Sequence, residues 1–245
     1  MNSATFLGTG GGRFVMLTQR RASAGIWVKI DGRNYIIDPG PGAIIHALKH
    51  GFDPGSLDGI FCTHNHLDHY GEVEVMVEAM THGLHRRHGI LYLQEDVVKY
   101  ISQYHRDKTH LVPLHPNDKT PVESSVVDVL PTHQHSNGVG LKFNTSSGVF
   151  TYAGDTGYNM DLAKNYVGSK ILVLNTIFPT GHPAKTHLNT DYAAEIALTA
   201  KPEKLVITHF GIRMLNVGPE KQAEIIRKKT NIDTVAAYDG MTVQI

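Results

Sequence analysis

Short apolar runs separated by glycine, proline and charged residues recur along the whole chain of 245 residues. Runs of this length between turn residues are typical of buried or half-buried β-strands. We therefore expect strands over residues 4–7, 26–30, 34–37, 58–62, 90–93, 126–130, 139–143, 149–153, 171–175, 204–207, 235–238 and 241–244. The apolar run over 13–18 is also strand-like.

Apolar residues at intervals of three and four positions predict helices between several of these strands. The expected helices cover residues 43–50, 71–80, 94–106, 190–200 and 220–229. Glycine-containing turns predict three hairpins, at Asp31-Gly32, Ser146-Ser147-Gly148 and Asp239-Gly240. Strands and helices are interspersed in both halves, and we find no repeat, low-complexity tract or linker. We therefore expect a single domain over residues 1–245.

The stretch Thr63-His64-Asn65-His66-Leu67-Asp68-His69 lies between an expected strand and an expected helix. It places imidazoles and a carboxylate in one loop at the C-terminal end of a strand, where open α/β sheets have their ligand sites. Imidazole and carboxylate together suit zinc, manganese or iron. The alternative interpretation is a polar surface loop with hydrogen-bonded histidines, which offers no packing reason for this density of ionisable groups.

Three further expected strands also end in ionisable residues. These residues are His133 or His135, Asp155 and His209. The recurrence indicates that one edge of a sheet collects imidazoles and carboxylates. A dinuclear site needs about three ligands for each ion, a bridging group and an open position for water or substrate, and this set of residues supplies the ligands and the bridge.

The expected ligands divide into two groups. One ion would be held by His64, His66 and a third histidine, and the other by Asp68, His69 and His209. Asp155 would bridge the two ions through its two carboxylate oxygens. Hydroxide between two such cations is a nucleophile at neutral pH, because metal binding lowers the pKa of water. Zinc is the expected metal, and manganese or iron also fits the two aspartates.

Two histidines compete for the remaining ligand position. His133 and His135 both follow the strand over 126–130 within a few residues. We favour His133 as the ligand because it follows the strand more directly. His135 would then lie behind the ligands or face the substrate.

The glycine-rich segment Gly8-Thr9-Gly10-Gly11-Gly12 has two interpretations. A glycine loop binds phosphate when it opens a helix, but here a strand-like run follows. We therefore favour either a close approach of the backbone near a site or a tight turn. The other histidines of the first half are expected at the surface: His82, His85, His88, His105, His110 and His115.

These motifs together resemble the metallo-β-lactamase superfamily of hydrolases. His64-Asn65-His66-Leu67-Asp68-His69, a later histidine, Gly154-Asp155-Thr156 and Thr208-His209-Phe210 follow one another in the order found in that superfamily. The resemblance covers nearly the whole chain. It implies an α+β fold, an αββα sandwich of two mixed β-sheets flanked by helices, with two metal ions at one edge. It also implies a metal-dependent hydrolase.

Within the superfamily the chain is most similar to the ribonuclease Z-like phosphodiesterase branch, through Phe6-Leu7-Gly8-Thr9-Gly10 and through His187 followed by Thr190. In that branch the matching histidine works with the first-motif aspartate in proton transfer. The resemblance therefore gives His187 a catalytic role with Asp68 as its partner.

Ribonuclease Z carries a long arm that grips tRNA, inserted between its later motifs in one common form. The segment between His133 and Asp155 is too short to hold such an arm, and we find no basic, glycine-rich arm elsewhere. We therefore expect a small phosphodiester or cyclic phosphate as substrate. A lactone, ester or thioester hydrolase on the same metal site is the alternative, and a metal-binding structural or sensor protein without turnover is the third hypothesis.

Charge and composition agree with a small-molecule substrate. Basic and acidic residues both number 23, so the chain lacks the basic excess of a nucleic-acid or membrane binder. The single cysteine, Cys62, excludes an intrachain disulfide and fits a reducing compartment. We expect no signal peptide and no membrane span, and hence a cytoplasmic protein. A homodimer is compatible with the sequence.

Overall fold

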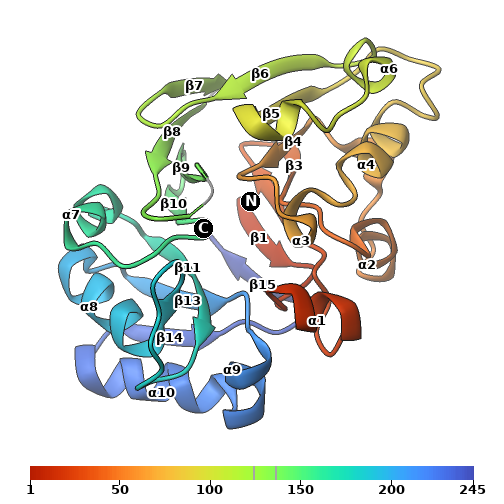
Figure 1. Ribbon diagram of the computed structural model, residues 1–245. Helices are drawn as coiled ribbons and strands as arrows, with labels where there is room; N and C mark the ends of the chain where they lie inside the picture. Colours follow the sequence, from red (N-terminus) through yellow and green to blue (C-terminus); the bar gives the residue numbers. More distant parts are fainter. Residues whose placement is uncertain (124, 136) are drawn as a thin grey trace.

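Two mixed β-sheets face each other in the computed structural model, which describes residues 1–123, 125–135 and 137–245 (Figure 1). The strands are β1 (Ser3–Phe6), β2 (Ile26–Ile30), β3 (Arg33–Ile37), β4 (Gly59–Cys62), β5 (Ile90–Gln94), β6 (His110–Leu114), β7 (Lys119–Val122), β8 (Ser125–Pro131), β9 (Val139–Thr145), β10 (Gly148–Tyr152), β11 (Ile171–Phe178), β12 (Leu188–Asn189), β13 (Lys204–Thr208), β14 (Asp233–Ala236) and β15 (Met241–Gln244).

Short helices connect the strands. They are α1 (Arg13–Thr18), α2 (Ala43–Lys49), α3 (Leu67–Tyr70), α4 (Val73–Met80), α5 (Glu95–Val98), α6 (Gln103–Arg106), α7 (Met160–Ala163), α8 (Thr190–Ala200), α9 (Ile212–Val217) and α10 (Pro219–Thr230), with 3₁₀ turns η1 (Pro54–Ser56) and η2 (Lys164–Tyr166). Within the described residues, none of these helices has both the length and the apolar character needed to cross a membrane.

The first sheet has the order β15-β1-β2-β3-β4-β5-β6, and the second has the order β14-β13-β11-β10-β9-β8-β7 with β12 beside β11. In the first sheet β3 to β6 are parallel. In the second sheet β10, β11, β13 and β14 are parallel, whereas β7 to β10 alternate in direction. Both sheets are therefore mixed.

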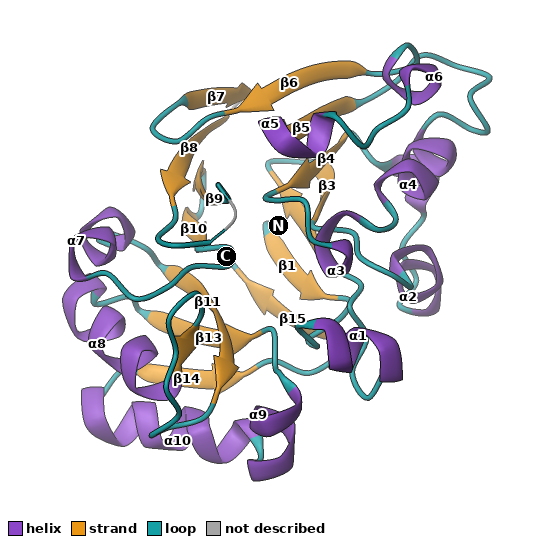
Figure 2. Ribbon diagram, in the orientation of Figure 1, coloured by secondary structure: helices purple, strands orange, loops and turns teal. Residues whose placement is uncertain are grey.

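Helices cover the outer face of each sheet, and the two inner faces pack against each other (Figure 2). Aromatic rings occupy the core between the sheets: Phe61 stacks on Tyr92 at 4.3 Å between centroids and meets Phe143 edge-on at 5.2 Å. α2 and α4 bury apolar side chains against the first sheet, and α7, α8 and α10 do so against the second. The αββα sandwich predicted from the resemblance is confirmed.

The strand-like interpretation of residues 13–18 is wrong, because this run forms helix α1. Only Val15 of its six residues is buried, whereas Phe14 and Leu17 lie in solvent. A short apolar run has too few residues for its period to separate helix from strand. The predicted helix over 94–106 is also interrupted, since it forms only α5 and α6, and Ser102 caps α6 by accepting from the His105 N–H.

The hairpin predicted at Asp239-Gly240 is also wrong. β14 pairs in parallel with β13 in the second sheet, whereas β15 pairs with β1 in the first sheet. The turn therefore crosses between the sheets. Asp239 fixes this crossing, because its carboxylate accepts from the Thr9 N–H at 2.9 Å, the Thr9 hydroxyl at 2.6 Å and the Ala22 N–H at 2.8 Å. The other two hairpins, β2–β3 and β9–β10, are confirmed.

Replacing Asp239 with alanine should lower the free energy of unfolding by about 2–3 kcal/mol, because it removes a charged acceptor from two backbone N–H groups. Urea denaturation measures this change. The matched control is Asp233→Ala, which removes an exposed carboxylate paired with Lys204 on the surface and should change stability little. Equal losses in the two variants would contradict the role given to Asp239.

Candidate metal centre

The C-terminal ends of strands from both sheets meet at one edge of the sandwich (Figure 1). β10 and β13 run in the same direction within the second sheet. β8 runs in that direction too, because β9 lies between β8 and β10 and is antiparallel to both. β4 supplies the corresponding end from the first sheet. The segments after these four strands, including helix α3, bring together His64, His66, Asp68, His69, His135, Asp155 and His209.

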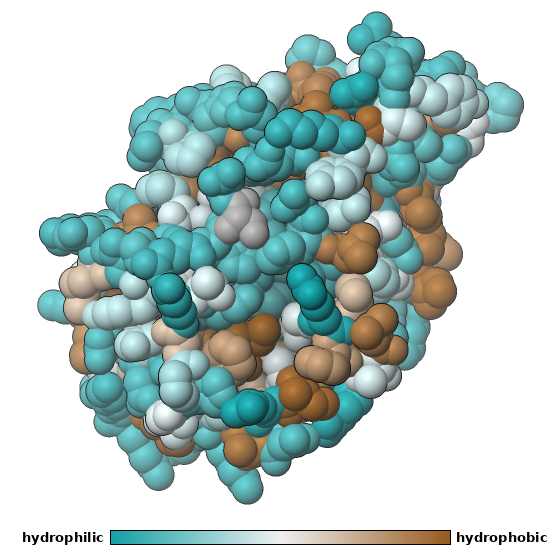
Figure 3. Space-filling view, in the orientation of Figure 1, coloured by the Kyte–Doolittle hydropathy of each residue, from teal (hydrophilic) through white to brown (hydrophobic). Residues whose placement is uncertain are grey.

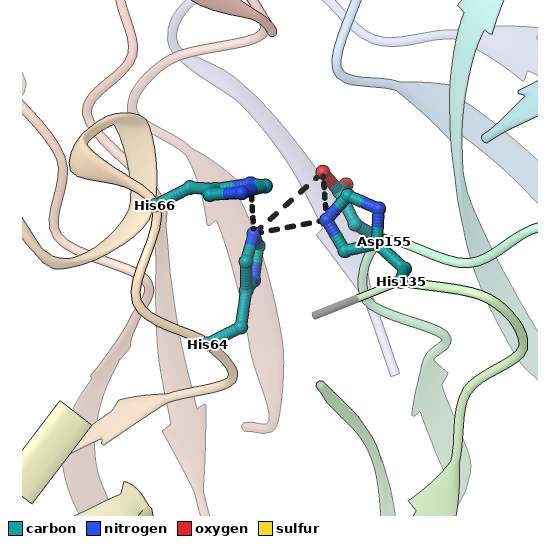
Figure 4. Close-up of side chains that lie close together, drawn as sticks. All are labelled: His64, His66, His135 and Asp155. Atoms are coloured by element: carbon teal, nitrogen blue, oxygen red, sulfur yellow. Dashed lines mark hydrogen bonds and ion pairs between the residues drawn. The ribbon is translucent and has the colours of Figure 1, made fainter. Parts of the chain in front are cut away.

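Three imidazole nitrogens and one carboxylate oxygen form the first group (Figure 4). His64 Nε2 lies 3.0 Å from His66 Nδ1 and 3.3 Å from His135 Nε2. Asp155 Oδ2 lies 3.8 Å from His64 Nε2 and 3.6 Å from His135 Nε2. Side chains of three different loops therefore direct one ligand atom each toward a common point.

Asp68, His69 and His209 form the second group. His209 Nε2 lies 3.0 Å from His69 Nε2 and 3.4 Å from Asp68 Oδ2. Asp155 Oδ2 reaches this group as well, at 3.5 Å from His69 Nε2. The same oxygen therefore approaches ring nitrogens of both groups, which is the position that a bridging carboxylate requires.

Hydrogen bonds from outside the two groups orient three of the rings. Asp38 Oδ2 accepts from His69 Nδ1 at 2.9 Å, and the Thr186 carbonyl accepts from His135 Nδ1 at 3.0 Å. Because each Nδ1 donates outward, Nε2 is the nitrogen that faces the centre. Partners of this kind fix the orientation of metal-binding imidazoles and raise their basicity.

His64 is oriented through a relay. The Thr63 hydroxyl donates to Asp38 Oδ2 at 2.8 Å, so its oxygen is free to accept from His64 Nδ1 at 3.1 Å. Tyr152 also donates to Asp38 Oδ2, at 2.9 Å. Asp38 was not among the predicted site residues, although it follows β3 just as the ligands follow their own strands. The position of Asp38 directly after a strand is the sequence signal that could have identified it as a site residue.

Burial controls the charge of the first group. It lowers the pKa of His64 well below the usual value and also lowers the pKa values of His66 and His135. These rings are therefore neutral, the form that binds a metal. Burial opposes protonation of His69 too, but the carboxylates of Asp155 and Asp38 outweigh it and raise its pKa well above the usual value.

The donor set fits two divalent cations. Burial alone would raise the pKa of Asp155, but neighbouring His209 and His69 hold it well below the usual value, so the carboxylate is charged. His187 Nδ1 and His209 Nδ1 are buried, and neither has a hydrogen-bond partner among the described residues. Buried carboxylates and unpaired ring nitrogens at this density are stable when cations bind them.

The glycine loop approaches the second group closely, as predicted. A Cβ atom on Gly11 would lie only 2.2 Å from His209 Nδ1, so only glycine fits there. The Gly12 N–H donates to Asp68 Oδ2 at 2.8 Å. His209 itself has φ 61°, a left-handed conformation that is rare for a residue with a side chain and that occurs preferentially at functional sites.

The preference for His133 as the third histidine is corrected by the structure, which places His135 in the first group. The backbone N–H of His133 donates to Thr156 Oγ1 at 2.9 Å, and its side chain is half-exposed outside both groups. Gln134 has φ 52°, so the chain reverses between the two histidines and turns His135 inward. The choice of His133 used only its distance from the strand end, which does not show that Gln134 adopts a left-handed conformation.

His187 lies beside the bridging carboxylate. Its Nδ1 is 3.6 Å from Asp155 Oδ2, and its ring packs against that of His135 at 4.6 Å between centroids. Asp68, its expected partner, lies against His69 and His209 and lines the same cleft as His187. Burial lowers the pKa of His187 to about 4, so the ring is neutral near pH 7.

This fold and this centre define a metallo-hydrolase. A model of the beta-lactamase superfamily domain matches residues 33–210. An uncharacterized protein of Methanocaldococcus jannaschii is 31% identical over 251 residues, which cover 98% of this chain and 94% of that protein. The chain belongs to the beta-lactamase superfamily.

Several solved structures are similar to the whole chain, and three of them show the range of the likeness. The metallo-β-lactamase-fold protein YhfI of Bacillus subtilis has a TM-score of 0.85 at 16% identity, covering 99% of this chain and 98% of its own. A diphosphatase of the PhnP family has a TM-score of 0.74 at 20% identity, and the match covers 100% of this chain and 98% of that protein. The short form of human tRNase Z has a TM-score of 0.77 at 16% identity, and the match covers 99% of both chains. At these identities the likeness establishes the fold.

Changing His135 to alanine should remove bound metal, whereas changing His133 to alanine should leave the metal content near that of the wild type. The reason is that only His135 directs a ring nitrogen toward His64 and Asp155. Inductively coupled plasma mass spectrometry of the purified, folded variants measures the metal-to-protein ratio. Loss of metal from His133→Ala with retention in His135→Ala would reverse the assignment.

Proposed function

We propose that this protein is a phosphodiesterase that hydrolyses a small phosphodiester or cyclic phosphate at the metal centre. The observation that carries the proposal is the shared position of Asp155 Oδ2, close to both His69 and His135. His64, His66 and His135 would hold one cation and Asp68, His69 and His209 the other, with Asp155 between them. Such cations would supply charge neutralisation for a phosphodiester and would lower the pKa of water. We expect zinc as the metal.

His187 is the candidate for proton transfer. It lines the same cleft as Asp155 and His209, and its side chain is 19% exposed. Because burial lowers its pKa, it is neutral near pH 7 and can accept a proton released during attack. It can then return that proton to the leaving oxygen. Its proximity to Asp155 supports this role.

A small substrate is supported by the path of the chain. The described residues between His133 and Asp155 form a loop and the β9–β10 hairpin, with no protruding arm. The formal net charge is zero, which does not favour a polynucleotide. Two of the proteins with a similar fold are a diphosphatase and a tRNase Z, and both names describe phosphorus chemistry. These observations favour a phosphoryl over a carbonyl substrate.

The proposal predicts that the metal-replete protein hydrolyses bis(p-nitrophenyl) phosphate or a cyclic nucleotide in preference to a lactone or a thioester. Chelation with EDTA and the variant Asp155→Ala should each abolish turnover, because both remove the cations. Turnover of the lactone or thioester without any phosphodiester activity would contradict the proposal and favour a carboxylic-ester hydrolase.

The variant His187→Ala refines the same assay. p-Nitrophenolate leaves readily without protonation, whereas the alkoxide of a cyclic nucleotide does not. The substitution should therefore lower kcat by about 10²–10⁴ for the cyclic nucleotide and much less for bis(p-nitrophenyl) phosphate. Metal content should stay unchanged. An equal loss for both substrates would show that His187 has no role in protonating the leaving group.

A further inference from the structure

A cleft of about 590 Å³ opens onto both ligand groups of the metal centre. His66, Asp68, Asp155, His187 and His209 line it from the centre. The other side is formed by α1 through Arg13, Met16 and Leu17, together with Leu67. The cleft therefore reaches from the ligand groups to α1.

This part of the cleft is apolar and exposed. Leu17 is 75% exposed and Leu67 is 56% exposed, although both are large aliphatic residues. Figure 3 shows apolar side chains gathered around α1 on the face that carries the opening of the cleft. An apolar surface beside a site that binds anions is characteristic of pockets that recognise a ligand with one polar and one apolar end.

The position of α1 relative to the centre is fixed. The Gly12 N–H immediately before the helix donates to Asp68 Oδ2 at 2.8 Å, so α1 starts at a predicted metal ligand. Just beyond its end, Arg20 donates to Asn216 Oδ1 at 3.0 Å on α9. Hydrogen bonds near both ends of α1 therefore hold Met16 and Leu17 beside the ligand groups.

We propose that Met16 and Leu17 of α1, with Leu67, form a subsite for an apolar alkyl or aryl group of the substrate. The inference rests on the proposed function and refines it: the substrate is an ester whose anionic group binds the cations and whose organic group lies on α1. Arg13, at the start of the helix, lines the same cleft and adds positive charge that suits the anionic end.

Alkylphosphonates test the subsite without turnover, because their carbon–phosphorus bond is not hydrolysed. Isothermal titration calorimetry would compare methylphosphonate with hexylphosphonate on the metal-replete protein. We expect the hexyl compound to bind the wild type at least about tenfold more tightly, because each buried methylene is favourable. Met16→Gln/Leu17→Gln should remove that preference, and Leu17→Met should keep it.

The matched control is Val167→Gln, which replaces another exposed apolar residue, 51% exposed and not among the residues that line the cleft. It should retain the preference, and the metal content of each variant should equal that of the wild type. Equal affinity of the wild type for the two phosphonates would overturn the inference. So would light scattering that shows a dimer dissociated by Met16→Gln/Leu17→Gln, since these residues would then form an interface between copies.

The two proposals fail separately. A wild type that prefers hexylphosphonate but hydrolyses no phosphodiester retains the apolar subsite and loses the phosphodiesterase assignment. A wild type that hydrolyses phosphodiesters without any preference for the longer phosphonate retains the assignment and loses the subsite.

Discussion

The buried carboxylate of Asp155 is the group on which the arrangement of the site depends. Its side chain is 1% exposed, and ring nitrogens of His64, His69, His135, His187 and His209 lie within 4 Å of its oxygens. Asn175 donates to its Oδ1 at 2.7 Å. A buried anion is strongly unfavourable unless it is paired and hydrogen-bonded, so the surrounding imidazoles and the cations they would hold are what make this position stable.

The centre also connects the two sheets. The Asn175 amide that orients Asp155 donates to the Tyr152 hydroxyl at 2.9 Å, and Tyr152 donates in turn to Asp38. Asp38 follows β3 of the first sheet, whereas Tyr152 and Asn175 belong to β10 and β11 of the second. A continuous chain of hydrogen bonds therefore runs beneath both ligand groups. Metal bound at such a centre would stabilise the packing of one sheet on the other, because ligands from both sheets would share it.

Much of the fold and the site could be predicted from the sequence because the informative signals are local. Alternating and apolar runs gave most strands, and four strands that end in ionisable residues indicated a shared edge. The features that were missed depend on long-range pairing. Whether Asp239-Gly240 closes a hairpin or crosses between sheets depends on partners more than two hundred residues earlier, such as Thr9. The choice between His133 and His135 depends on the backbone angle of Gln134. Helix α1 has only six residues, too few for the helical spacing of apolar residues to be recognised.

The most direct test of this account is anomalous diffraction from crystals of the zinc-loaded protein. The account predicts two peaks about 3.5–4 Å apart. One should lie among His64, His66 and His135, the other among Asp68, His69 and His209, with the Asp155 carboxylate bound to both. A single ion with Asp155 turned away from it, or an ion bound by His133, would contradict the central claim.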